Sequence, residues 1–451
     1  MILQLLILFI KIMDCSSFDK FVIKGIFIDT KTMDSLRIRN GYLLIENGLI
    51  QQYSDNNPDI NLKLYDYSDK LIIPGLSDLH LHAPQYSYSG TGMDLELLDW
   101  LNKYTFKEES KYNDVEYSRK NYEFFVNALE KSATTRAVIF ASLYVDSTLL
   151  LMDLIENKKI IAYVGKVSMD RNSPDYYIEK NGNEETIRFI EECLNKNYKY
   201  VKPIITPRFT PSVSDDYMKQ LGIIAKKYNL AVQSHLSENL EEIKFVKNLR
   251  PNDSFYGESY DKYGLFGKEL KTVMAHCVFS TKEENQLIKK NGVYIAHCPT
   301  SNSNLTSGIC PASMYLRNGY NIGLGTDVAG GHTLDLFEVM RHAIQMSKLR
   351  FRYVDKKNKP LTLSEVLYMA AYKGGSFFGK VGLFEKDYEF DALILDESLV
   401  KNAKEFDISE RLERFIYNIN AKIEGKFIRG NKIIWVIIHK LINIFDKWYI
   451  I

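Results

Sequence analysis

Histidines occur at positions where they could bind a metal ion. The run PGLSDLHLH (74–82) ends on His80 and His82, two residues apart. In an extended strand residues i and i+2 face the same way, so both imidazoles can be presented to one point. Imidazole nitrogens are common metal ligands. An isolated H-x-H is often a surface coincidence, but further histidines at similar positions favour a metal site.

The elements that would position these histidines have the pattern of a barrel. Between Ile73 and about Phe378, short β-branched runs alternate with longer segments of helical period, and eight βα units of an α/β fold predict a TIM barrel. The expected strands are Ile72–Leu76, Thr134–Phe140, Ile160–Val164, Tyr200–Ile205, Leu230–His235, Thr272–His276, Val293–His297 and Asn321–Gly325. The expected helices are Asp114–Lys131, Glu184–Lys196, Asp215–Tyr228, Glu238–Asn248, Thr281–Lys290 and Leu334–Leu349.

Strands are also expected on both sides of the barrel. Phe21–Asp29 and Tyr42–Ser54 precede it, and Phe390–Leu395 and Ala421–Arg429 follow it. We therefore expect a small β-sandwich built from both chain ends. The expected divisions are an apolar extension (1–16), β-sandwich parts (17–70 and 385–434), the barrel (71–384) and a C-terminal tail (435–451).

Composition fits a globular protein without bulk affinity for nucleic acid. The 451 residues are 45% hydrophobic and 25% charged, and 58 basic against 57 acidic residues leave a formal charge of +1. Five irregularly spaced cysteines fit a reducing compartment, for which we expect the cytoplasm.

The apolar start, MILQLLILFIKIM, is shorter than the roughly 20 residues of a membrane helix. Its Lys11 lies inside the apolar run, unlike the charge of a signal peptide, so no membrane partner is expected.

The chemistry of a TIM barrel lies at the C-terminal ends of its strands. Five of the eight histidines fall at or just past such ends: His80, His82, His235, His276 and His297. Asp327, which ends GLGTD (323–327), could complete a ligand set of three histidines and one aspartate. Its alternative role is a helix N-cap, but the helix is expected only seven residues later. Such ligands around an open position suit zinc or iron(II).

A bound metal would lower the pKa of a water molecule to about 7 and supply hydroxide at neutral pH. Attack by hydroxide still requires a proton shuttle. Glu238 lies three residues past His235, at an expected strand-to-helix transition, and could fill that role. Alternatively, Glu238 could lie in the first turn of the helix, where its negative charge would interact favourably with the helix dipole.

Several runs resemble the guanine deaminase family of the amidohydrolase superfamily, over roughly Phe18 to Asn431. The matching runs are PGLSDLHLHAPQYS (74–87), VKPIITPRFTPS (201–212), QSHLSEN (233–239), TVMAHC (272–277), AHCPTSNSNL (296–305) and GLGTDVAGG (323–331). HAPQYS, TPRF and HLSEN are the runs most specific to guanine deaminases. The resemblance implies a TIM barrel with a small β-sandwich, one zinc ion (Zn²⁺) per chain with iron(II) possible, and a homodimer. It also implies hydrolysis of guanine to xanthine and ammonia.

The resemblance implies roles for individual residues. The implied metal ligands are His80, His82, His235 and Asp327. The implied catalytic residues are Glu238 as proton shuttle, His276 as the group that orients the ring or the water, and Asp327 as a proton carrier to the departing amine. The residues implied to contact the substrate are His82, Gln85, Arg208, Phe209, His235, Glu238, His276 and Asp327.

The implied purine contacts also make physical sense. Arg208 can donate to the six-position carbonyl oxygen that separates guanine from adenine. Gln85 offers a donor and an acceptor, and Phe209 can stack on the ring. Taken without the resemblance, Arg208 and Phe209 would be a loop arginine and a core phenylalanine. Cys277 and Cys298 are expected to be packed thiols and His297 a supporting residue. The histidines expected to be incidental are His332, His342 and His439.

Other enzymes and a non-enzyme compete with this reading. A cytidine-deaminase-type zinc enzyme is excluded because its P-C-x-x-C run is absent. Another aminohydrolase of the superfamily, acting on cytosine, adenine or triazines, stays open. A two-metal cyclic amidase would need a lysine at a strand end, whereas Lys202 opens its strand. An inactive scaffold would lose its ligands first, and here every proposed ligand is present.

Overall fold

The computed structural model describes residues 20–400, 402–418 and 422–433. The expected apolar extension (1–16) and C-terminal tail (435–451) lie outside these residues. Among the helices of the described part, none is both long and apolar enough to span a membrane.

A barrel of eight parallel strands forms the centre of the fold, as expected. Its strands are β5 (Leu76–His82), β6 (Thr134–Phe140), β7 (Ile161–Gly165), β9 (Val201–Pro203), β11 (Val232–Leu236), β12 (Thr272–His276), β13 (Tyr294–His297) and β14 (Asn321–Leu324). They follow the order β11-β12-β13-β14-β5-β6-β7-β9. A parallel bridge between Ile205, just after β9, and Val232 closes the ring. Two short strands, β8 (Val167–Ser168) and β10 (Thr206–Pro207), pair beside it.

The first barrel strand begins later than expected. The prediction of Ile72–Leu76 is wrong, because β4 (Leu64–Pro74) belongs to a second sheet and β5 follows it directly. Gly75 separates the two strands: its N–H donates to the Asp391 carbonyl at 3.1 Å, and a Cβ there would lie 2.4 Å from the Thr135 side chain. One continuous extended segment therefore contributes a strand to each of the two sheets, and its hydrophobic pattern does not show where one strand ends and the next begins.

Helices connect the barrel strands on the outside. They are α4 (Val115–Lys131), α5 (Val145–Asn157), α6 (Gly182–Lys196), α7 (Asp215–Tyr228), α8 (Leu240–Leu249), α9 (Glu258–Asp261), α10 (Lys282–Asn291), α11 (Pro299–Asn304), α12 (Ala312–Arg317), α13 (Leu336–Tyr353) and α14 (Leu363–Leu367). The predicted set lacks α5 because residues 147–152 are buried without interruption, which leaves no apolar stripe. Tyr144, at its start, also provides no side-chain cap.

A second unpredicted helical segment lies between β5 and α4. It consists of η1 (Ala83–Tyr88), α2 (Leu97–Trp100), η2 (Leu101–Thr105), α3 (Phe106–Ser110) and η3 (Lys111–Asn113). Its apolar side chains pack against Phe140, the last residue of β6, and against Phe209. The segment therefore covers the carboxyl ends of the barrel strands, where the chemistry is expected.

The second sheet combines both ends of the described chain. Its strands are β1 (Lys20–Thr32), β2 (Ser35–Glu46), β3 (Leu49–Ser54), β4, β15 (Ala392–Asp396), β16 (Lys422–Ile428) and β17 (Asn431–Ile433). They form one continuous sheet in the order β17-β16-β15-β4-β1-β2-β3, where a β-sandwich is expected. Backbone bonds from Ile50 to Tyr388 and from Phe390 to Gly48 join edge strand β3 to the segment before β15. The sheet thus curls around its own aromatic core.

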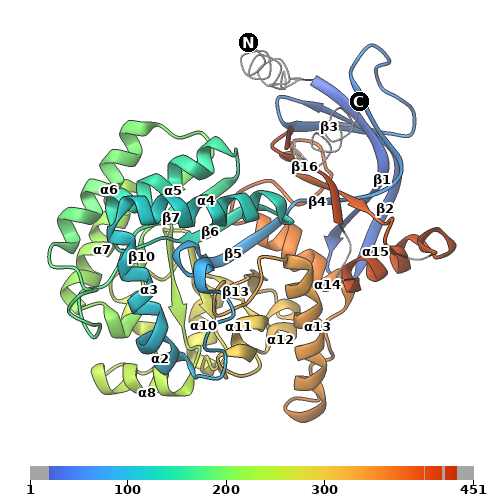
Figure 1. Cartoon of the computed structure of the whole chain (residues 1–451). Coiled ribbons are helices and arrows are strands. Elements are labelled where there is room, and N and C mark those ends of the chain that lie inside the picture. Colours follow the sequence, from blue (N-terminus) through green and yellow to red (C-terminus); the bar gives the residue numbers. More distant parts are fainter. Residues whose placement is uncertain (1–19, 401, 419–421, 434–451) are drawn as a thin grey trace, which may run out of the picture.

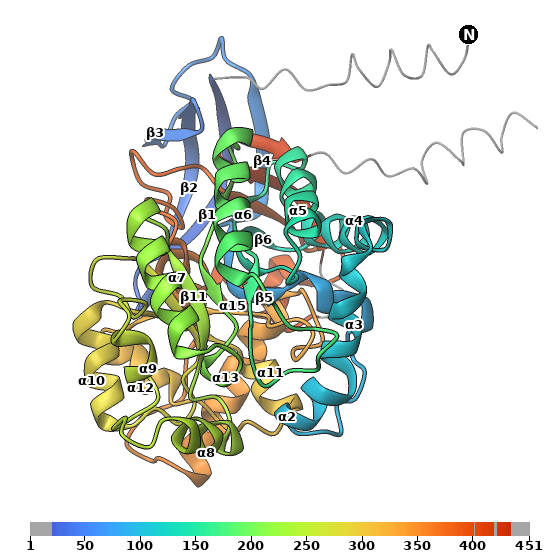
Figure 2. The same ribbon diagram turned by 90° about the vertical axis from the view of Figure 1, so that its left-hand side faces the viewer.

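The second sheet leaves the carboxyl ends of the barrel open. In both views β1–β3 stand at one end of the molecule and α2 and α8 at the other (Figures 1 and 2). Arg136, near the start of β6, links the sheet to the barrel because it donates to Asp391 at 2.8 Å and to Glu389 at 2.6 Å. On the C-terminal side, α15 (Ile408–Tyr417) packs against α13. The sheet is therefore anchored at the amino ends of β5 and β6.

Candidate active site

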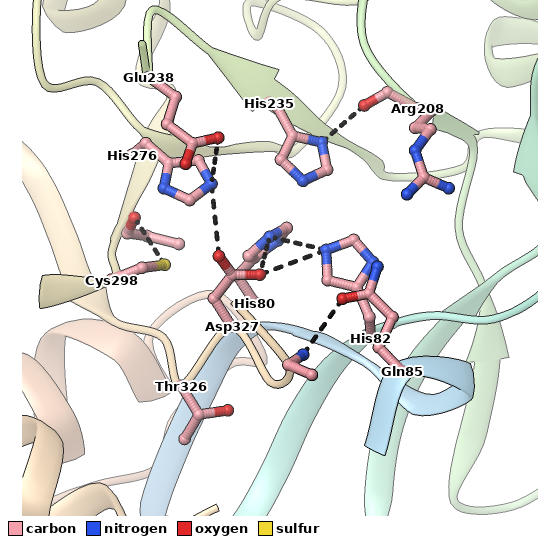
Figure 3. A network of polar contacts seen from close by, with 12 residues as sticks. His80, His82, Gln85, Arg208, His235, Glu238, His276, Cys298, Thr326 and Asp327 are labelled. Atoms are coloured by element: carbon pink, nitrogen blue, oxygen red, sulfur yellow. Dashed lines mark hydrogen bonds and ion pairs between the residues drawn. The ribbon is translucent and has the colours of Figure 1, made fainter. Parts of the chain in front are cut away.

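Three side chains converge at the carboxyl ends of β5 and β14. The Nε2 atoms of His80 and His82 lie 3.2 Å apart, and they lie 3.1 and 3.3 Å from Oδ1 of Asp327 (Figure 3). The alternation of β5 places both rings on one side. The Asp327 N–H donates to the His80 carbonyl at 2.8 Å, which fixes the two strand ends to each other. These donor atoms lie within 4.8 Å of one another and could hold a metal ion.

His235 and His276 face the same centre. His235 Nδ1 lies 2.6 Å from the Arg208 carbonyl oxygen, so Nδ1 carries the proton and Nε2 is available as an acceptor. His276 Nδ1 lies 2.9 Å from Oδ1 of Asn302, which directs its Nε2 toward Glu238 at 3.3 Å. His80, His235 and His276 form a second group of donors within 4.8 Å. The structure therefore brings together all four histidines expected to have a role.

The surroundings keep His80, His235 and Asp327 in the protonation state that metal binding requires. Burial lowers the pKa of His80 to about 4 and holds the pKa of His235 well below its usual value. Burial alone would raise the pKa of Asp327, but the neighbouring histidines hold it well below its usual value. Neutral imidazoles and an ionised carboxylate are the forms that bind metal ions.

Glu238 precedes a helix instead of opening it. The expected helix start at Glu238 is wrong: α8 begins at Leu240, with Asn239 as N-cap and Glu242 completing a capping box. This position rules out the first-turn role. Burial and, after it, the charge of Asp327 raise the pKa of Glu238 to about 8. A carboxyl group that titrates near neutral pH can both accept and release a proton.

Asp327 lies in a loop that hydrogen bonds between neighbouring residues stabilise. It is not a helix cap, because Asp335 caps α13. Its φ of 47° lies in the left-handed region, which is unfavourable for residues other than glycine. Asp78 stabilises this turn by accepting hydrogen bonds from the Thr326 N–H at 3.0 Å and from its hydroxyl at 2.6 Å.

One pocket contains every residue that the resemblance implies for substrate contact. Among its lining residues are His82, Gln85, Arg208, Phe209, His235, Glu238, His276 and Asp327. The rest of the wall is largely apolar and includes Leu97, Trp100, Leu101 and Leu305. This arrangement suits a flat, mostly uncharged ring with polar edges.

Known proteins are similar to this chain in sequence and in fold. Residues 71–430 match the amidohydrolase family. The chain belongs to the amidohydrolase family. It is 39% identical over 381 residues to the guanine deaminase of Mus musculus, which covers 81% of this chain and 83% of the relative. It is 32% identical over 395 residues to the guanine deaminase of Escherichia coli, which covers 83% of this chain and 87% of the relative.

A solved structure supports the same relationship. The guanine deaminase of C. acetobutylicum, with bound guanine in its active site, matches with a TM-score of 0.89 and 48% identity. The match covers 92% of this chain and 100% of that chain. The predicted resemblance to the guanine deaminase family is therefore confirmed.

Three polar residues that hold side chains of this amidohydrolase site were not predicted. Asn302 contacts His276, Ser307 contacts Glu238, and Glu109 contacts Gln85 and Arg208. Asn302 lies inside the AHCPTSNSNL run, and Ser307 follows that run by two residues, so the run could have indicated both. Glu109 lies in KEES (107–110), which carries no motif. Its role becomes visible only once the chain is folded.

The cysteines near the site are buried. Burial raises the pKa of the Cys277 and Cys298 thiols well above the usual range. Protonated thiols are poor metal ligands, which fits the expectation of packed side chains. Cys298 nevertheless forms a donor group with His276 and Asp327, with its sulfur within 4.8 Å of theirs.

The remaining histidines of the described residues, His297, His332 and His342, do not line the pocket. His297 is buried at the end of β13, and burial lowers its pKa to about 3. His332 pairs with Glu338 at 2.9 Å, and His342 lies 3.1 Å from the Ser303 hydroxyl. The last histidine of the chain, His439, lies outside the described residues.

Proposed function

We propose that the chain is a guanine deaminase, which hydrolyses guanine to xanthine and ammonia. One observation carries the proposal: a single pocket joins a group of metal-binding side chains and Glu238 to two purine-recognising side chains, Gln85 and Arg208. The guanine deaminases to which the chain is similar support the choice of substrate.

Recognition would rest on the polar edges and the flat face of the purine. Arg208 donates to the carbonyl oxygen at position six, which adenine lacks. Gln85 provides both a donor and an acceptor for the neighbouring edge. Phe209 and the apolar wall of the pocket cover the ring face. Together these contacts would hold the amino-bearing carbon beside Glu238.

The donor set fits a divalent cation. His80, His82, His235 and Asp327 would hold one zinc ion per chain, with iron(II) as the alternative, because both accept nitrogen and carboxylate ligands. When bound, the ion would lower the pKa of a water molecule toward about 7. The remaining steps belong to side chains of the protein.

Glu238 moves the protons of the reaction. It takes a proton from the attacking water and delivers it to the ring nitrogen beside the attacked carbon. His276, held by Asn302, orients the water and the ring, and Asp327 helps to pass a proton to the departing amine. A carbon–oxygen bond forms, the carbon–nitrogen bond breaks, and ammonia leaves. One water molecule is consumed for each ammonia released.

The test is turnover combined with metal analysis. The purified chain is incubated with guanine, adenine, cytosine and ammeline, and ammonia, xanthine and metal content are measured. We expect equal amounts of xanthine and ammonia from guanine, with about one metal ion per chain. Stronger turnover of another substrate would favour a different aminohydrolase of the superfamily. A folded, metal-loaded sample that is inert toward all four would favour a scaffold.

The compartment and the assembly belong to the same proposal. The cysteine pattern favours the cytoplasm, and the resemblance implies a homodimer. Sedimentation of the purified chain tests the second point.

A further inference from the structure

Glu109 is a buried carboxylate directly behind the substrate pocket. Only 1% of this α3 residue is exposed. Its Oε1 accepts hydrogen bonds from Gln85 Nε2 at 2.7 Å and from Arg208 Nη2 at 3.2 Å. Its Oε2 accepts from Arg208 Nη1 at 2.6 Å and from the Tyr177 hydroxyl at 2.8 Å. One carboxylate thus holds both polar side chains that are proposed to recognise the purine.

These contacts determine which way the Gln85 amide points. Its nitrogen donates to Glu109, and its Oε1 accepts from the Ala329 N–H at 3.1 Å. A rotation of the amide by half a turn would bring two acceptors together at Glu109 and two donors together at Ala329. The second N–H and the second oxygen lone pair of the Gln85 amide therefore have fixed positions in which they can bind a ligand.

Glu109 also balances the charge of Arg208. Arg208 is 2% exposed, and the central carbon of its guanidinium lies 5.3 Å from the centre of the Phe106 ring. Burial alone would raise the pKa of Glu109, but the charge and the hydrogen bonds of Arg208 oppose burial and the pKa is lowered, so the carboxylate stays ionised. Positive and negative charges cancel in this corner of the pocket. It offers N–H donors to a neutral carbonyl oxygen without attracting an anion.

We infer that Glu109 is a positioning residue that sets the order of hydrogen-bond donors and acceptors for the purine and makes this corner select a neutral ring. It acts through Gln85 and Arg208 and is absent from the residues that line the pocket. The inference rests on the proposed function, because it assumes that these two side chains bind guanine.

Xanthine provides a probe of the charge effect. It is a stronger acid than guanine and becomes an anion at mildly alkaline pH. The strength of its inhibition at different pH values therefore measures whether this corner of the pocket binds a negative charge. E109Q removes the charge of Glu109 and keeps its size. E109D keeps the charge but is one methylene too short to reach both Gln85 and Arg208. E108Q is the matched control, because Glu108 lies on the same helix and pairs with Lys111 at 2.6 Å.

E109Q should raise the KM for guanine by about tenfold or more, because it loosens hydrogen bonds of a charged pair, with a smaller change in kcat. Its unbalanced Arg208 should also make xanthine a tighter inhibitor at alkaline pH than at acidic pH, compared with the wild type. E109D should raise KM while it keeps the wild-type pH dependence of xanthine inhibition. E108Q should match the wild type in both measurements.

A folded E109Q variant with wild-type KM and wild-type xanthine inhibition would overturn the inference. If circular dichroism finds E109Q unfolded, E109D decides: a raised KM supports the role of Glu109, and an unchanged KM refutes it. A wild-type chain without guanine turnover would refute the proposed function itself. An active wild type with unaffected variants would refute only the role of Glu109.

Discussion

The Ser307 hydroxyl donates a hydrogen bond of 2.9 Å to Oε1 of Glu238. Both residues are buried, and Ser307 comes from the loop between α11 and α12. The other carboxyl oxygen, Oε2, lies 3.3 Å from Nε2 of His276. The loop therefore holds one oxygen of the carboxyl group, while the second oxygen faces the centre of the pocket.

Ser307→Ala should shift the pH dependence of catalysis. The hydroxyl stabilises the ionised carboxylate and so opposes the upward effect of burial on the pKa of Glu238. Its loss should raise that pKa further, and Glu238 must be ionised to accept a proton. We expect the acidic limb of kcat/KM to move to higher pH by roughly half a unit to one unit, the equivalent of one hydrogen bond. Ser303→Ala is the control, because it removes a hydroxyl that donates to the Pro299 carbonyl and does not contact Glu238. An acidic limb that does not move would separate Ser307 from the proton transfer.

Glu238→Gln should abolish most turnover without loss of metal. Glutamine keeps the size of the side chain but cannot accept the proton of the attacking water. We expect kcat to fall by about 10²–10⁴-fold, the usual contribution of general acid–base catalysis. Metal content should stay unchanged, because Glu238 is not among the proposed ligands. Glu241→Gln, at an exposed position on α8, is the control. Rates near those of the wild type would remove Glu238 from the mechanism.

The barrel strands could be predicted because their signal is local. Thr134–Phe140 and Thr272–His276 coincide with β6 and β12, since each is a short β-rich run with helical segments around it. The segment Ile72–Leu76 failed for the opposite reason. There two strands follow each other without a polar break, and only their partners in space assign them to different sheets.

The candidate site divides in the same way. His80 and His82 could be placed because strand alternation is a local rule, and their rings do meet. Glu109 could not, because Gln85 and Arg208 lie 24 and 99 residues away along the chain. A contact between distant elements leaves no periodic pattern around either residue. Residues that position other residues, such as Glu109, can therefore be identified only from the folded structure.

The ion pair between Arg136 and Asp391 should contribute strongly to stability. Both side chains are almost fully buried, and they join the barrel to the second sheet at 2.8 Å. Asp391→Asn leaves the guanidinium with one anionic partner, Glu389, and removes most of the charge compensation for its burial. We expect a loss of roughly 3–5 kcal/mol in the free energy of unfolding, measured with denaturant. Asp216→Asn, at an exposed position, should change it by less than about 0.5 kcal/mol. A comparably small loss for Asp391→Asn would show that the pair contributes little.

Glu109 should make the folded protein sensitive to acid. Although burial opposes ionisation, Arg208 lowers the pKa of Glu109 below the ordinary value of 4.5. A group whose pKa is lower in the folded state stabilises that state fully above the ordinary value, and its contribution is lost as the pH falls through the folded-state value. The wild type should therefore be more stable than Glu109→Gln by a constant amount above pH 4.5, and this difference should shrink at lower pH. Denaturant unfolding of both proteins from neutral to strongly acidic pH measures it. A difference that stays constant into acid would mean that folding does not change the pKa of Glu109, and a difference that grows in acid would mean that folding raises it.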